Sequence, residues 1–142
     1  HTSHSLADHE ELSLRDVAAH PLVIPPAGTA MRRVIDRAAG TAGVQIKPLA
    51  EIDGVRLMAS LAFEGFGPAI VPATAVPRWL RGDFRRIRVP ELPRRVVAWA
   101  NRRRPAPSTA TKAVREATGS LLERVGSRQP GVHVGVESPV RL

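Results

Sequence analysis

The stretch Glu51–Pro72 constrains the fold most, because it predicts a helix, a glycine turn and a buried strand in immediate succession. Its first half carries apolar residues at three- and four-residue steps, the period of an α-helix: Ile52, Val55, Met58, Leu61 and Ala62. Gly65 and Gly67 end this helix around Phe66, and the apolar run Ala69–Val71 is short enough for a strand. Such a succession is half of an α/β crossover unit, whose turns can face ligands.

The flanking segments predict that strands and helices continue to alternate. Ser13 is a plausible N-cap for a short helix over 14–19, and Thr29 and Gly43 are plausible caps for a helix over 30–42. The buried face predicted for that helix is Met31, Val34, Ile35, Ala38, Ala39 and Ala42. The predicted strands are 22–24, 44–49, 86–89 and 96–100, with a short helix over 73–80. We therefore expect a mostly parallel sheet with helices on its faces.

A final helix is predicted over 109–125, capped by Ser108. Its inward positions are Ala110, Ala113, Val114, Ala117, Leu121 and Val125. From Gly126 onward glycine, proline and polar residues predict a disordered tail, and residues 1–11 predict a loop because they show no periodicity.

Two loops are candidates for ligand contact, since parallel sheets bind ligands at the carboxyl ends of their strands. One is Pro25–Thr29, after the first strand, and the other is Gly65–Gly67, before the third. At the first loop Thr29 offers a hydroxyl, the following helix offers backbone N–H groups, and Arg32 or Arg33 offers a fork for a carboxylate. The alternative is that Thr29 only caps its helix and the arginines face water. The signature of a phosphate loop is missing.

Charge is distributed unevenly along the chain. Ten arginines stand against Asp83 and Glu91 between Arg78 and Arg104, a net +8 in a chain whose total is also +8. A basic stretch can bind nucleic acid, but no aromatic residues interleave with it as in a single-strand binder, and we favour a solvated arginine-rich surface. Cysteine is absent, which fits a reducing interior and allows no disulfide or thiolate site. No apolar run is long enough to span a membrane.

Catalytic patterns are weak. His1, His4 and His9 lie in a polar terminal stretch without the spacing of a metal site, and no Gly-x-Ser-x-Gly elbow occurs. Acidic residues are scattered on predicted helix faces rather than paired. We therefore expect no enzyme activity, no cofactor and no metal.

The ordered motifs together resemble the effector-binding domain of LysR-type transcriptional regulators. The likeness covers residues 6–124 and begins with LSLRDVAAHPLVIP at 12–25, which resembles the entry to the second lobe of that domain. The further motifs are Gly28-Thr29, Arg32–Asp36, Glu51-x-Asp53, Leu57, Leu61-Ala62, Gly65-x-Gly67, Pro72, Trp79–Phe84, Val96–Ala100 with Arg102-Arg103, and Ser108–Thr118. Each motif is weak alone, and their order and spacing make the resemblance specific.

The resemblance implies an α/β fold of the periplasmic-binding-protein-like type 2 class, with a small and anionic effector held between two lobes. It implies that residues 1–11 form a hinge segment, 12–92 a complete second lobe, 93–125 a returning strand and terminal helix of a first lobe only partly present, and 126–142 a disordered tail. The effector-contacting positions carried over are Pro25, Gly28, Thr29 and Arg32, with Gly65, Phe66 and Gly67 opposite.

The resemblance also implies a cytoplasmic regulator that forms homodimers or homotetramers and contacts DNA through an N-terminal helix-turn-helix outside this chain. The alternative is a solute-binding protein of a transport system, which shares the fold class; a third reading is direct nucleic-acid binding through Arg78–Arg104. Pro68 departs from the family pattern, and it removes a backbone donor where the third strand begins. We expect the chain to be part of a longer protein and the segment Val96–Trp99 to be exposed, which predicts self-association or instability.

Overall fold

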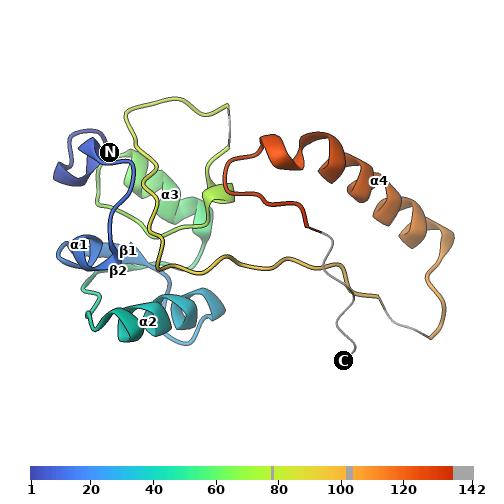
Figure 1. The fold of residues 1–142 in the computed structure, drawn as a ribbon, viewed down its shortest axis with the longest axis horizontal. Helices are drawn as coiled ribbons and strands as arrows, with labels where there is room; N and C mark the ends of the chain where they lie inside the picture. Colours follow the sequence, from blue (N-terminus) through green and yellow to red (C-terminus); the bar gives the residue numbers. More distant parts are fainter. Residues whose placement is uncertain (78, 102–103, 136–142) are drawn as a thin grey trace. The chain divides into compact units, whose positions relative to one another are not determined.

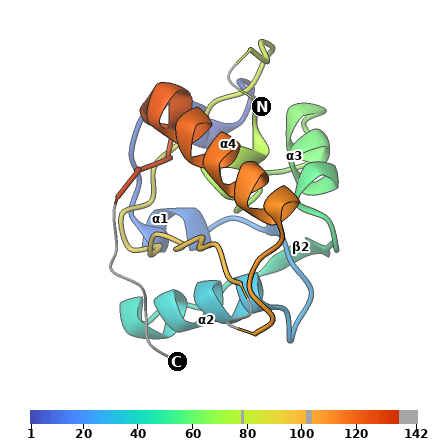
Figure 2. The same ribbon diagram turned by 90° about the vertical axis from the view of Figure 1, so that its right-hand side faces the viewer.

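The computed structural model describes residues 1–77, 79–101 and 104–135. The chain divides into two compact units, His1–Arg94 and Arg95–Leu142 (Figure 1). Among the described residues, the first unit contains the paired strands and three α-helices, and the second contains one long helix, α4 (Thr109–Val125), followed by a short 3₁₀ turn (Figure 2). The candidate site lies in the first unit.

The first unit is organised around a short parallel sheet. Strand β1 (Leu22–Ile24) is wholly buried and pairs with β2 (Pro48–Glu51), Leu22 opposite Pro48 and Ile24 opposite Glu51. On its other side Val23 pairs in parallel with Ala69. The first strand is therefore central, as its uninterrupted apolar sequence predicts for a strand covered on both faces.

The two helices that pack on this strand each begin at a side-chain cap. Helix α1 (Leu14–Ala18) begins with a capping box, in which the Ser13 hydroxyl accepts from the Asp16 N–H and the Asp16 carboxylate accepts from Ser13. These hydrogen bonds from Ser13 hold the pKa of Asp16 below its ordinary value. Helix α2 (Ala30–Ala42) begins at Thr29 and ends at Gly43, whose φ of 65° is the left-handed conformation of a glycine C-cap. Both sets of predicted caps are confirmed.

The core packs β1 against α1, α2 and the segment 69–71. Val17, Leu22, Ile24, Ile35 and Ile70 form one buried cluster, and a second cluster contains Leu14, Ala38 and Ala39. The predicted buried face of α2 is confirmed at Ile35, Ala38 and Ala39. The prediction for Val34 is wrong, because 41% of its surface is exposed. This position lies outside the arc of α2 that the small sheet can cover.

Helix α3 (Val55–Phe63) confirms the central prediction of a helix followed by a glycine turn, and it buries Met58 and Ala59. It starts three residues after the first apolar position of the predicted stripe, Ile52. The backbone N–H of that residue instead donates to the Ile24 carbonyl, at 3.0 Å. Ile52 therefore belongs to the end of the sheet and not to the helix.

Three predicted strands of the first unit are shorter than expected or shifted. The strand predicted at 44–49 occurs at Pro48–Glu51, since that stretch is the one that pairs with β1. The predicted strands 69–71 and 86–89 are each reduced to one isolated bridge, Val23 to Ala69 and Glu11 to Arg88. Pro68 is compatible with its position because its carbonyl accepts the Val23 N–H, at 2.9 Å, while Ile70 supplies the return donor.

Two further predictions for the first unit are corrected. The helix predicted over 73–80 is only the 3₁₀ turn η2 (Ala73–Ala75), and Arg78 lies outside the described residues. Pro77 prevents a longer helix in this segment. Residues 1–11 are not a structureless loop, because they contain the 3₁₀ turn η1 (Ser5–Asp8) with Leu6 and Ala7 buried.

The second unit confirms the final helix and corrects its surroundings. Helix α4 (Thr109–Val125) begins at Ser108 as predicted, and η3 (Gly126–Arg128) follows it where a disordered tail is predicted. The tail residues 136–142, like Arg102 and Arg103, lie outside the described part of the chain. The face of α4 predicted to point inward is exposed in this structure, as Val114, Leu121 and Val125 show.

The strand predicted at 96–100 does not form either. Val96, Val97 and Trp99 are exposed, which confirms their predicted exposure, and no described segment pairs with them. An isolated apolar run cannot satisfy its backbone groups as a strand without a neighbour. The first unit is thus a small α/β structure, and its assignment to one lobe of a two-lobed domain stays a prediction.

Candidate functional site

The loop after β1 is shaped by Thr29 and Gly28. The Thr29 hydroxyl donates to the Pro26 carbonyl, at 2.9 Å, and accepts from the Arg32 N–H, at 3.2 Å. Gly28 has a φ of 83°, which the turn into α2 requires. The N–H groups of the first α2 turn have no partner within the helix, as at any helix start. Thr29 is therefore a cap in this structure, and it satisfies the Arg32 N–H at the start of α2.

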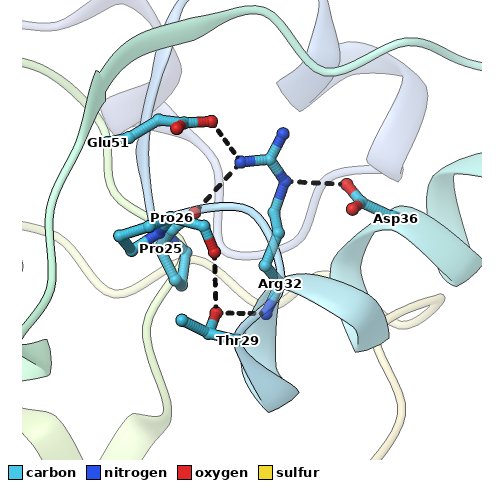
Figure 3. Close-up of polar contacts among 6 residues, drawn as sticks. All are labelled: Pro25, Pro26, Thr29, Arg32, Asp36 and Glu51. Atoms are coloured by element: carbon cyan, nitrogen blue, oxygen red, sulfur yellow. Dashed lines mark hydrogen bonds and ion pairs between the residues drawn. The ribbon is translucent and has the colours of Figure 1, made fainter.

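Arg32 is held by two carboxylates and a carbonyl (Figure 3). Its Nε donates to Asp36 at 2.9 Å, and its Nη1 donates to Glu51 at 2.5 Å and to the Pro25 carbonyl at 3.0 Å. Only 14% of the side chain is exposed. The hydrogen bonds that Arg32 donates to Glu51 first and Asp36 second raise its pKa above the ordinary value. The guanidinium thus fastens α2 and the Pro25 loop to the end of β2.

This arrangement separates the two arginines that were candidates for binding a carboxylate. Arg32 already contacts carboxylates of its own chain, whereas Arg33 is exposed and donates to the Gly28 carbonyl at 2.6 Å. Among the described residues Arg33 has no carboxylate partner. Arg33 is therefore the cation of this loop that remains open to an anion. The local sequence gives part of this difference, since Asp36 lies four residues after Arg32 whereas Arg37 lies four residues after Arg33, but the contact to Glu51, 19 residues away, is not visible there.

The second candidate loop lies at the other end of the strands. Because Val23 and Ala69 pair in parallel, the residues before Ala69 run beside the amino end of β1. Gly65, with a φ of 79°, lies against the His1 ring, and Phe66 is 51% exposed. Gly67 faces Leu49 and Val23 so closely that a Cβ there would collide with Leu49. The structure brings Pro25, Gly28, Thr29 and Arg32 together and leaves Gly65–Gly67 apart from them.

The carboxyl edge of the sheet includes residues that the sequence did not single out. Glu51 ends β2 beside the Pro25 loop, and the turn 52–54 follows it directly. The strand pairing identifies them, because the ends of β1 and β2 lie side by side. The position of these residues directly after a strand could have identified them. The predicted strand, however, ends at residue 49, and β2 ends at Glu51.

The described residues offer little other site chemistry. No cluster of three or more histidine, cysteine, aspartate or glutamate side chains there has a metal-binding arrangement. Within the same residues, no helix has both the length and the apolar character needed to traverse a bilayer. His4 and His20 do lie together, with ring centroids 5.1 Å apart.

Comparison with known proteins gives one match. A family model described as the LysR substrate binding domain matches residues 1–134. No curated protein and no solved structure matches the chain.

Proposed function

We propose, since this chain belongs to the LysR substrate-binding domain family, that it is the effector-sensing part of a bacterial LysR-type transcriptional regulator. The observation that carries the proposal is the family match over residues 1–134, which extends through both compact units. In this role the chain binds a small molecule and performs no catalysis. The sheet with one open carboxyl edge in the first unit supports this role.

The proposed domain has two lobes. Residues 12–92 form the second lobe, 93–125 return to the first, and 1–11 belong to the hinge between them. The exposed apolar side chains of α4 support this division, because a helix with such a stripe is stable when another layer covers it. The rest of the first lobe would supply that layer.

The effector site is proposed at the carboxyl edge of the sheet. Arg33, the N–H groups of the first α2 turn and the Pro25–Thr29 loop converge there, which suits a small anionic metabolite. Arg32 acts as a positioning residue, because it holds the Pro25 carbonyl against Glu51. In this proposal Gly65, Phe66 and Gly67 do not contact an effector at the carboxyl edge, because they lie at the other end of the strands. Any contact with an effector would be made at the interface with the other lobe.

The regulatory mechanism is a population shift. An effector that binds one arrangement of the lobes better than the other favours that arrangement by its difference in binding free energy. In a homodimer or homotetramer in the cytoplasm, this changes the spacing of helix-turn-helix domains that contact DNA and lie outside this chain. The partners are thus a second copy, an effector and, indirectly, operator DNA.

The first test is an effector screen on the full-length regulator. Small aromatic and aliphatic carboxylates are added while thermal unfolding and operator binding are measured. A true effector at 100 times its Kd should stabilise the binding-competent state by about 2.7 kcal/mol and raise Tm accordingly. If no member of the panel changes either Tm or operator binding, the sensing function is contradicted.

The second test compares two adjacent arginines. Arg33→Met should remove most of the anion-dependent Tm shift while changing the free energy of unfolding by less than about 0.5 kcal/mol, as for an exposed side chain. Arg32→Met should lower the free energy of unfolding by about 1–2 kcal/mol, because Glu51 and the Pro25 carbonyl lose their donor. Chemical denaturation and ligand titration of both variants measure these effects.

The two variants also locate the site. If Arg33→Met retains the full effector response, the carboxyl edge of this sheet is not where the anion binds, even when sensing itself is established. If Arg32→Met is as stable as the wild type, the guanidinium does not fasten the loop to β2.

A further inference from the structure

Two histidines from different segments meet beside the N-terminal turn. The Nδ1 atom of His4 accepts the Leu6 N–H at 3.2 Å and so acts as the N-cap of η1. The His20 ring, which lies between α1 and β1, packs edge-on against the His4 ring at a centroid distance of 5.1 Å and an interplanar angle of 66°. Both residues are half-buried. This contact connects residues 1–9 to the centre of the first unit.

The segment that His4 anchors contributes to the core. Leu6 and Ala7 of η1 are buried, with 8% of each residue exposed. The other attachments of this segment are few: the Thr2 N–H donates to the Asp83 carbonyl at 2.7 Å, and His1 lies against Gly65. Beside the packing of Leu6 and Ala7, the His4 contacts are therefore among the few attachments of η1.

Both histidine contacts depend on neutral imidazole. A proton on Nδ1 of His4 converts the cap acceptor into a donor that faces the Leu6 N–H. A proton on His4 also places a positive charge against the His20 ring, at a centroid distance of 5.1 Å. Burial first, and then the charge of His20, lower the pKa of His4 below its ordinary value of 6.5.

The surrounding charges do not offset this repulsion. On α1 the carboxylate of Asp16 is engaged by Ser13 and faces His9 and Arg15. The other acids near these histidines in sequence are Asp8, Glu10 and Glu11, of which Glu11 pairs with Arg88, and within the described residues neither imidazole forms an ion pair.

We propose that the His4–His20 contact is a pH-sensitive latch, which holds residues 1–9 on the first unit while His4 is neutral and releases them as His4 becomes protonated. The sign follows from proton linkage: the released segment binds more protons than the attached one, so attachment weakens as the pH falls below 6.5. If the proposed function holds, the latch lies at the hinge of the effector domain and makes lobe movement sensitive to pH. The latch itself requires no effector.

Hydrogen exchange of the whole chain tests the latch. Protection factors, corrected for the intrinsic pH dependence of exchange, are measured at pH 7.5 and pH 5.0 for the hydrogen-bonded amides of Leu6, Ala7 and His9. We expect protection in this segment to fall about fourfold or more, the repulsion between two unit charges about 5 Å apart in water, while amides of α2 stay constant.

Three variants assign the effect. His4→Asn keeps an N-cap acceptor that cannot be protonated, so the segment should stay protected and lose its pH dependence. His20→Phe keeps a ring without a charge and should reduce the fall to less than about twofold. His9→Gln is the control and should respond like the wild type. Equal protection of the wild type at both pH values, or an undiminished fall in His4→Asn and His20→Phe, would overturn the proposal, and neither outcome depends on effector binding.

Discussion

Leu22→Ala should lower the free energy of unfolding of the first unit by about 2–5 kcal/mol, the range for deleting most of a fully buried leucine side chain. Leu22 has no exposed surface and packs in the cluster with Val17, Ile24, Ile35 and Ile70. It lies in the central strand, so its neighbours are fixed on both sides and the cavity cannot easily collapse. For a core this small, such a loss is a large part of the total stability.

The measurement must report on the first unit alone. Trp99 and helix α4 belong to the second unit and would add their own signal to fluorescence or circular dichroism. Hydrogen exchange of the amides of α2 and β1 avoids this problem. The matched control is Leu57→Ala on α3, where 52% of the residue is exposed, and its effect should stay within about 0.5 kcal/mol. Equal losses in the two variants would contradict the core described for β1.

Gly54→Ala should cost about 1–3 kcal/mol, because the residue has a backbone conformation that L-amino acids rarely adopt. Gly54 has φ 116° and ψ 101° at the start of α3, where the chain turns from β2 into the helix. Space is not the obstacle, since the nearest atom to an added Cβ is the Leu57 Cβ at 4.0 Å. The cost is therefore conformational strain, and it should appear as reduced protection of the Met58 amide, which donates to the Gly54 carbonyl.

Gly40→Ala is the control of opposite sign. Gly40 lies inside α2 with ordinary helical geometry, and an added Cβ meets nothing within 4 Å. Alanine should therefore stabilise α2 by about 0.8–1.0 kcal/mol through its higher helix propensity. If both substitutions change stability in the same direction, the special conformation of Gly54 is wrong.

Elements whose signals are contained within a few neighbouring residues were predicted well. Ser13 with Asp16, Thr29 with Gly43, and Ser108 fix where three helices begin or end, because a cap is a hydrogen bond between residues about three positions apart. The strand Leu22–Ile24 was also predicted correctly, since a continuous apolar run bounded by prolines indicates a buried strand.

Elements that need a distant partner were predicted poorly. The runs 86–89 and 96–100 have strand-like sequences, yet one forms a single bridge with Glu11 and the other forms no strand. A strand exists only when another segment completes its hydrogen bonds, and sequence periodicity carries no information about that segment. The same limit applies to α4, whose apolar stripe predicts a buried face that no described residue covers.

The family of this protein could be read from the sequence alone, because it rests on the order of short local motifs, whereas ligand contact by the loop after β1 stays a prediction. Only the tertiary structure decided what the loop residues do. It assigns Arg32 to Glu51 and Asp36, leaves Arg33 open, and separates Gly65–Gly67 from Pro25–Thr29. The reason is physical. Which residue a side chain contacts, and at which end of the sheet a loop lies, depend on strand pairing between residues far apart in the chain, and no local pattern records that pairing.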